Sequence, residues 1–227
     1  SPSVSTDYDL PTTNYTQLGQ ITAKKLSLVS TGNGSVITKT YDGTNNAGSA
    51  SDFKVSGFVS GSGDNITVTG LTSATYADIH ASTAIDNLVT FSGLTFGSFT
   101  AGSGLTSPSE SKDYELPTTN YTQQGNITAR QLTLISTSAT GATSLTKVYD
   151  GTNNAGSGSS AFIVSNYAPN SGDNYAITGL SSATYASTHA STAVDNLVTF
   201  SGLTFGSLTA GSGLTSPSES KDYELPT

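Results

Sequence analysis

One stretch of this chain occurs twice, almost without change. Residues 87–118 read NLVTFSGLTFGSFTAGSGLTSPSESKDYELPT, and residues 196–227 repeat them with one difference, Phe99 against Leu208. Such close copies predict one structural unit folded twice. They also favour selection for length and copy number, because complete active sites are rarely duplicated side by side.

The period of the repeat predicts how the two units are arranged. The triplet Tyr-Asp-Gly at residues 41–43 returns at 149–151, an offset of 108 residues, and the long stretch returns after 109. Familiar solenoid repeats have periods of roughly 20–50 residues. A period twice that length instead predicts separate modules that follow one another along the chain, like beads on a string.

Composition excludes several classes of protein. Charged residues make up 11% of the chain and the formal net charge is −8, so a nucleic acid would meet net repulsion. The chain has no Cys, which in a secreted protein indicates maturation without disulfide formation. Its apolar runs are far shorter than the ~20 residues that span a bilayer. We expect a secreted chain without nucleic-acid binding or direct membrane insertion.

Short apolar runs with a period of two predict strands. Clusters of Gly, Ser, Asn and Asp separate these runs. The predicted strands of the first copy are Ile21–Val29, Val36–Tyr41, Phe53–Phe58, Asn65–Leu71, Asn87–Leu94 and Tyr114–Tyr121. Six or seven strands per repeat without a helical pattern predict an all-β fold of tandem antiparallel β-sandwich modules, Ig-like and elongated.

The Tyr-Asp-Gly triplets each follow a predicted strand and precede Thr-Asn-Asn-Ala-Gly-Ser. An Asp at such a place accepts backbone N–H bonds in an Asx turn, and Gly takes a positive φ. The Tyr ring can bury its body while its hydroxyl reaches a backbone partner. We interpret the triplets as a structural motif, consisting of Tyr41, Asp42, Gly43, Tyr149, Asp150 and Gly151.

The same residues carry a resemblance to a known family. Ile21–Leu26 reads Ile-Thr-Ala-Lys-Lys-Leu, Lys39–Thr44 reads Lys-Thr-Tyr-Asp-Gly-Thr, and Asn120–Thr122 reads Asn-Tyr-Thr. Together they resemble the YDG-type repeat domains of large bacterial surface proteins, including filamentous-haemagglutinin-like adhesins. The resemblance implies a secreted β-sandwich repeat with an adhesive or spacer role and no catalytic residues. The stretch Gly97–Ser111 departs from the family pattern.

On this frame the chain divides into two modules. We expect module 1 to comprise residues 21–126 and module 2 residues 127–227, with residues 1–20 as the closing strand of a preceding repeat or the first strand of module 1. Module 2 is then expected to lack its final strand, and an unpaired sheet edge accepts a strand from another chain. Residues 1–20 of one molecule could fill that edge in the next, giving head-to-tail filaments.

Few residues suggest chemistry. His80 and His189 occur once per repeat without a neighbouring acid–base partner, which is typical of surface or capping residues. The motifs of hydrolases and NTPases are absent, so we expect no enzyme, no catalytic residue and no cofactor. The repeated carboxylates are weak candidates for calcium, because no Asp-x-Asp-x-Asp loop supports a site. These candidates are Asp42, Asp64, Asp150 and Asp173.

The functional expectation is a structural segment of a bacterial surface adhesin or extracellular fibre. It would act as a spacer or stalk at the cell surface or in the extracellular matrix, with neighbouring repeats as partners and self-association into filaments as a further step. The alternative is a carbohydrate-binding adhesive module for a glycan or host receptor, because Tyr recurs beside Asn and Asp. The tyrosines in question are Tyr8, Tyr15, Tyr76, Tyr114, Tyr121 and Tyr185.

Overall fold

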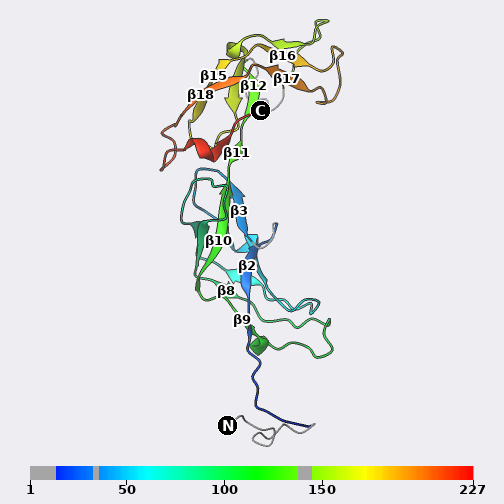
Figure 1. Ribbon diagram of the computed structural model, residues 1–227, viewed down its shortest axis with the longest axis vertical. Coiled ribbons are helices and arrows are strands. Elements are labelled where there is room, and N and C mark those ends of the chain that lie inside the picture. The colour runs from blue at the N-terminus through cyan, green and yellow to red at the C-terminus, as the bar shows by residue number, and fades with distance from the viewer. Residues whose placement is uncertain (1–13, 33–35, 138–144, 227) are drawn as a thin grey trace, which may run out of the picture.

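The structure, a computed structural model, describes residues 14–32, 36–137 and 145–226. Within these ranges the chain is all-β, and its helices are three-residue 3-10 turns. Two groups of strands follow one another along the long axis (Figure 1). The all-β prediction is confirmed. No helix in these ranges has the length and apolar character needed to cross a membrane.

The described residues of module 1 form ten strands and two 3-10 turns. The strands are β1 (Lys24–Lys25), β2 (Ser27–Ser30), β3 (Ile37–Thr40), β4 (Phe53–Ser56), β5 (Val68–Gly70), β6 (Ser73–Tyr76), β7 (Asn87–Ser92), β8 (Thr95–Phe96), β9 (Tyr114–Glu115) and β10 (Asn120–Thr128). The turns are η2 (Ala50–Asp52) and η3 (Ser111–Asp113). The largest sheet has the order β3-β10-β7-β6, and smaller pairs are β1-β9, β2-β4 and β5-β8.

Module 2 repeats most of these pairings. Its strands are β11 (Arg130–Gln131), β12 (Thr133–Ser136), β13 (Asn154–Gly156), β14 (Phe162–Ser165), β15 (Asn174–Gly179), β16 (Ser182–Tyr185), β17 (Val198–Ser201), β18 (Thr204–Thr209) and β19 (Tyr223–Glu224), with turns η4 (Ser159–Ala161) and η5 (Ser220–Asp222). The pairs β11-β19, β12-β14 and β15-β18 match β1-β9, β2-β4 and β5-β8. The remaining sheet of module 2 has the order β13-β16-β17.

Strand directions differ in part from the expected antiparallel pattern. β10 pairs antiparallel with β7 but parallel with β3, and the short pairs β1-β9 and β11-β19 are also parallel. The predicted antiparallel pairing therefore holds for the other pairs of the described strands but not for these three. Parallel partners require long crossover connections, and β10 and β3 are separated by most of module 1.

β6, β8 and most of β10 lie outside the predicted strands, because the predicted strand Tyr114–Tyr121 covers only the start of β10. β6 reads Ser-Ala-Thr-Tyr and has few large apolar residues, so it shows no alternation in the sequence. Its pairing with β7 makes it a strand, with Ala74 opposite Phe91 and Tyr76 opposite Val89. Tertiary context rather than propensity decides such short segments.

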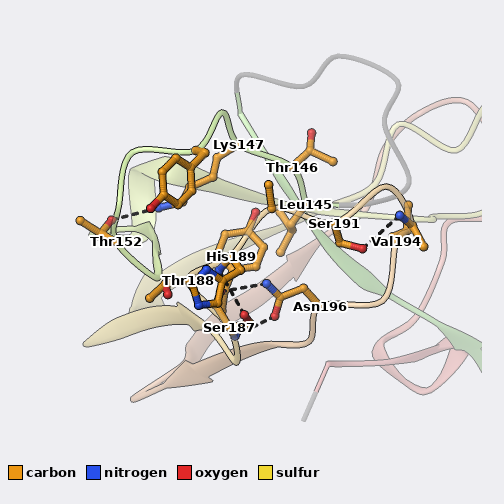
Figure 2. A pocket seen from close by; sticks show the side chains of 14 residues that line it. Leu145, Thr146, Lys147, Thr152, Ser187, Thr188, His189, Ser191, Val194 and Asn196 are labelled. Atoms are coloured by element: carbon orange, nitrogen blue, oxygen red, sulfur yellow. Dashed lines mark hydrogen bonds between the residues drawn. The ribbon is translucent and has the colours of Figure 1, made fainter.

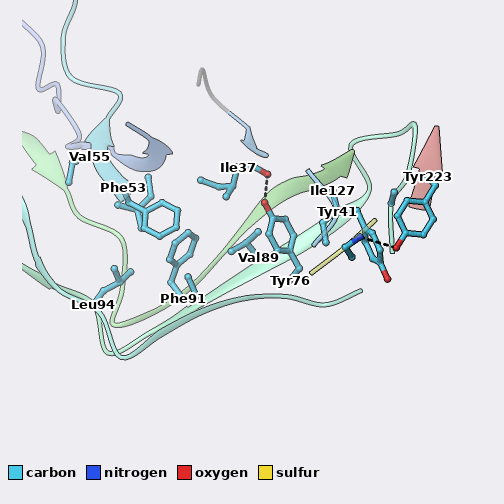
Figure 3. Packing of buried hydrophobic residues seen from close by; sticks show 14 of the residues in the cluster. Ile37, Tyr41, Phe53, Val55, Tyr76, Val89, Phe91, Leu94, Ile127 and Tyr223 are labelled. Atoms are coloured by element: carbon cyan, nitrogen blue, oxygen red, sulfur yellow. Dashed lines mark hydrogen bonds between the residues drawn. The ribbon is translucent and has the colours of Figure 1, made fainter. Parts of the chain in front are cut away.

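The core of module 1 lies between the four-stranded sheet and the β2-β4 pair (Figure 3). Alternate residues of β7 are buried, as a period of two requires, and these include Val89 and Phe91. The ring of Phe91 meets that of Phe53 from β4 edge to face, with centroids 4.9 Å apart. Such contacts join the two sheets through apolar burial, which is the main stabilising term in folding.

The stretch Gly97–Ser111, whose topology the sequence did not predict, folds back along the loop before β5. Gly102 N–H donates to Asp64 Oδ1 at 2.8 Å, and Gly104 N–H donates to the Ser62 carbonyl at 2.9 Å. A Cβ at residue 102 would lie 2.1 Å from that carbonyl. Only glycine permits this approach. Gly211 makes the matching bond to Asp173 in module 2.

The two modules are joined by a very short connection. β10 ends at Thr128 and β11 begins at Arg130, so one residue separates them. β10 thus extends past the expected boundary between residues 126 and 127, and the first strand of module 2 follows almost directly. Of the predicted segment 1–20, residues 1–13, including Tyr8, lie outside the described residues.

Candidate functional site

Each Tyr-Asp-Gly triplet forms a tight turn at one end of its module. In module 1, Asp42 Oδ1 accepts hydrogen bonds from the backbone N–H and the hydroxyl of Thr44, both at 2.9 Å. Gly43 has φ +78°, a conformation that costs glycine little. Asp150, Gly151 and Thr152 repeat this geometry.

A lysine side chain stabilises each turn. Lys39 Nζ lies 2.6 Å from Asp42 Oδ1, and it also donates to the carbonyls of Thr44 and Asn46. Burial alone would raise the pKa of Asp42, but the hydrogen bond from Lys39 and those from Thr44 lower it below its usual value. Lys147 makes the same contact in module 2, and it helps to lower the pKa of Asp150 to about 2.

Tyr41 links the first turn to module 2. Its side chain is 0% exposed, and its hydroxyl lies 3.0 Å from the Ser218 hydroxyl. Its ring meets that of Tyr223 edge to face, with centroids 5.6 Å apart (Figure 3). Burial raises the pKa of Tyr41 to about 12. The predicted backbone partner for this hydroxyl is therefore wrong, because the partner is a serine side chain of the other module.

Asp222 of η5 is the second link. Its side chain is 0% exposed. One carboxylate oxygen accepts the Ala81 N–H at 2.7 Å, and the other lies 2.9 Å from His80 Nδ1. His80 Nε2 also lies 3.5 Å from a carboxylate oxygen of Glu219. The expectation of a surface or capping role for His80 is thus corrected, since this histidine is enclosed between the modules.

Two further contacts complete what we call the joint, the set of contacts between modules 1 and 2. Leu214 packs on Gly43, where a Cβ would lie 2.6 Å from a Leu214 methyl group. Arg130 Nη1 donates to the Tyr41 carbonyl at 3.4 Å, and its Nε donates to the Asn166 carbonyl at 2.7 Å. Apolar, aromatic, polar and charged groups therefore all cross the same boundary.

Next to the joint, the buried carboxylate of Asp173 fixes the loop of module 2 that contacts module 1. Asp173 accepts hydrogen bonds from the Ser218 hydroxyl at 2.6 Å and from the Tyr223 hydroxyl. Burial would raise the pKa of Asp173, but these bonds lower it. In module 1, Asp64 accepts from the Tyr114 hydroxyl at 2.6 Å, and despite the opposing effect of burial its pKa falls to about 2.

The second copy of the turn is exposed. Tyr149 is 62% exposed where Tyr41 is fully buried, and His189 is exposed where His80 is enclosed. Nothing lies within 4 Å of a Cβ built on Gly151, in contrast to Gly43. A pocket of about 150 Å³ lies here, lined by residues that include Leu145, Lys147, His189 and Val194 (Figure 2).

The four calcium candidates are not brought together into one site. Asp42 and Asp150 sit in the two turns, while Asp64 and Asp173 are buried behind loops, and all four accept hydrogen bonds from protein donors. Within the described ranges, no group of three or more His, Cys, Asp or Glu residues is placed to hold a metal ion.

Of the five described tyrosines of the carbohydrate alternative, three are buried. Tyr76, Tyr114 and Tyr185 are buried, and Tyr121 is partly buried. The Tyr76 hydroxyl donates to the Ile37 carbonyl at 3.0 Å. Tyr15 is exposed, and Tyr8 lies outside the described residues. The rings that the structure describes do not form a common surface platform for a sugar.

The fold and the joint define a tandem-repeat protein whose two all-β modules meet through the Tyr-Asp-Gly turn of module 1. The family model of the YDG domain matches residues 22–122 and again residues 128–212. The chain belongs to the YDG domain family. No curated protein and no solved structure matches it.

Proposed function

We propose that this chain is a structural repeat segment of a secreted bacterial surface adhesin or extracellular fibre, acting as a spacer or stalk. The observation that carries the proposal is the joint. Tyr41 and Asp222 are fully buried by contacts between modules, which restrict bending at the boundary. A stalk requires that each added module extend the chain in a defined direction.

We further propose that each module is an Ig-like β-sandwich. Edge-to-face ring pairs between sheets support this in both modules, because Phe53 of β4 meets Phe91 of β7, and Phe162 of β14 meets Phe200 of β17. In each case a two-stranded sheet packs against a larger one. Facing sheets with interdigitated apolar residues are the defining feature of a sandwich.

A role without catalysis fits the use of the charged groups. The turns are stabilised by Asp42 and Asp150, and the loops by Asp64 and Asp173. The joint is stabilised by Asp222. Each carboxylate accepts hydrogen bonds that fix backbone or neighbouring side chains. An extracellular location suits the Cys-free and hydroxyl-rich composition.

Small-angle X-ray scattering of the chain tests the spacer role. We expect an elongated profile, with a maximum dimension that calcium and chelator leave unchanged. A compact profile, in which the two modules lie side by side, would contradict it. Screening the same protein on a glycan array tests the carbohydrate alternative, for which saturable binding would be the supporting result.

A further inference from the structure

Two early strands of module 1 pair with its two late strands, and both pairs are parallel. β1 pairs with β9, and β3 pairs with β10. In the longer pair, Thr40 at the end of β3 lies opposite Thr128 at the end of β10. Each pair therefore joins the part of the chain that enters the module to the part that leaves it.

Further backbone hydrogen bonds extend both pairs. The Leu26 N–H donates to the Glu115 carbonyl at 2.9 Å, directly after β1. The Tyr41 N–H donates to the Thr128 carbonyl at 2.8 Å, directly after β3. The Thr128 hydroxyl also donates to the Lys39 carbonyl at 3.2 Å. Both pairs are thus longer in hydrogen bonds than in strand residues.

A pull on the two ends of module 1 loads these pairs along their strands. The chain enters at β1, leaves through β10 and continues directly into β11 of module 2 (Figure 1). Tension draws β1 and β3 towards the N-terminal side and draws β9 and β10 the opposite way. Parallel strands pulled in this manner slide along each other, so the hydrogen bonds between them are loaded together. Paired strands pulled apart from one shared end instead lose their hydrogen bonds one after another.

β10 also transfers the load into the rest of the module. It lies between β3 and β7, and it pairs antiparallel with β7 from Asn120 to Gly125. At Gly125 the fit is close, because a Cβ would lie 2.7 Å from Val89 Cγ2 and 2.8 Å from Tyr76 Cε1. Sliding of β10 therefore disrupts its contacts with both neighbouring strands.

The longer pair is shielded from water. Ile37 and Ile127 are 1% and 0% exposed, and the Tyr76 hydroxyl donates to the Ile37 carbonyl at 3.0 Å (Figure 3). The joint covers the far end of the pair, because Tyr41 is 0% exposed and packs on Tyr223 of module 2. Buried backbone groups that lose their partners are not readily satisfied by water, which makes their separation costly.

We propose that module 1 is a load-bearing unit, in which the β1-β9 and β3-β10 pairs form a mechanical clamp against tension along the chain. The inference rests on the proposed function, because a stalk is pulled at its two ends. It adds a property that a passive spacer does not need, namely a resistance that depends on the direction of the pull. Module 2 begins in the same way, since β11 pairs parallel with β19 and the Leu132 N–H donates to the Glu224 carbonyl at 2.8 Å.

Single-molecule force spectroscopy in two pulling directions tests the clamp. The chain has no Cys, so pairs of introduced cysteines can serve as handles. Thr22→Cys with Thr133→Cys places handles beyond the two ends of module 1, and this pull slides the clamp strands along each other. Thr40→Cys with Thr128→Cys places handles at the adjoining ends of β3 and β10, and this pull peels the same pair apart. All four threonines are exposed.

The two directions should give different rupture forces. We expect sliding to require at least about twice the force of peeling at the same pulling speed, because several backbone hydrogen bonds must break together. Equal forces in the two directions, or a larger force for peeling, would overturn the inference.

A matched pair of glycine variants separates the clamp from overall stability. Gly125 lies in the clamp, where a Cβ would be 2.9 Å from the Ile37 carbonyl. Gly102 lies in a loop outside it, where a Cβ would be 2.1 Å from the Ser62 carbonyl. Substitution by Ala strains the fold at both positions, but only Gly125→Ala weakens contacts that must break first. Contacts that are still intact when the clamp ruptures do not change the rate of rupture.

At constant force between the handles at residues 22 and 133, Gly125→Ala should therefore rupture roughly tenfold faster or more than the unaltered clamp. Gly102→Ala should rupture at the unaltered rate. Equal acceleration by both variants, or acceleration by Gly102→Ala alone, would overturn the inference. The comparison of pulling directions needs neither variant, so it decides the matter even if Gly125→Ala does not fold.

The clamp and the spacer role fail separately. If sliding and peeling require equal forces but the scattering profile is elongated, the clamp is wrong and the spacer role stands. If the scattering profile is compact, the spacer role is wrong, and the clamp falls with it as a device of a stalk.

Discussion

The Nδ1 atom of His80 lies 2.9 Å from a carboxylate oxygen of Asp222, although 142 residues separate the two in the sequence. The same carboxylate accepts the Ala81 N–H through its other oxygen. One buried acid of module 2 thus binds a loop of module 1 through a side chain and a backbone group. This arrangement turns two modules into one stacked unit.

Replacing Asp222 should weaken the joint more than the matched replacement in module 1 weakens its own turn. Asp222 and Asp113 both accept the N–H that opens their 3-10 turn, from Glu219 and Glu110 respectively. Asp222 alone also holds Ala81. We expect Asp222→Ala to cost about 1–3 kcal/mol more than Asp113→Ala, because a buried donor is left unpaired. Urea denaturation of both variants measures the difference, and equal losses would show that the joint adds no stability.

Removing the Tyr41 hydroxyl should lower the stability of the protein measurably. Removing the hydroxyl of Tyr149, the equivalent residue of module 2, should change it little. Tyr41→Phe loses the hydrogen bond to Ser218, which we expect to cost about 0.5–1.5 kcal/mol. Tyr149→Phe changes an exposed hydroxyl and should stay within about 0.5 kcal/mol of the unaltered chain. Thermal denaturation of monomeric protein compares the two. A larger effect at Tyr149 would contradict the assignment of the joint to the first turn.

Acid should destabilise the modules through Asp64. Its folded pKa is about 2, below the ordinary value of 3.8, so the ionised form is favoured by folding. The stability it contributes is fully present above about pH 4 and is lost as the pH falls towards 2. Urea denaturation at a series of pH values should show this decline. In Asp64→Asn the decline should be shallower, and an unchanged pH dependence would count against the role of Asp64.

The repeated Ala-Gly-Ser-Gly loop should not tolerate side chains. A Cβ at Gly102 would lie 2.1 Å from the Ser62 carbonyl, so Gly102→Ala must displace backbone. We expect a loss of about 1–3 kcal/mol. Gly32→Ala is the control, since nothing lies within 4 Å of that position. Similar melting temperatures for both variants would argue that the loop adapts freely.

The sequence predicted those parts of the fold that depend on residues close together in the chain. The alternation in residues 87–94 predicted β7, and the run Val36–Tyr41 predicted β3. The Asx turn at Asp42 follows from the chemistry of Asp and Gly, and it is present. β6 was not predicted because Ser73–Tyr76 has small residues. Its pairing with β7 makes it a strand.

The joint could not be predicted from one module, because its contacts join residues far apart in sequence. A lone His has no visible partner in the sequence, and the partner of His80 is on the other module. One signal was available: each repeat carries one His and one Ser-Glu-Ser-Lys-Asp-Tyr segment. Repetition of both indicated a shared role, but only the structure shows that the segment of one module meets the histidine of the preceding one.

A distance measurement between equivalent points of the two modules tests the central claim most directly. The chain has no Cys, so Thr90→Cys and Thr199→Cys, both exposed, place one spin label in each module. The account predicts a single narrow distance distribution by double electron–electron resonance, which broadens in Asp222→Ala. A broad distribution in the chain with Asp222 intact would show that the modules move independently, and would contradict the joint.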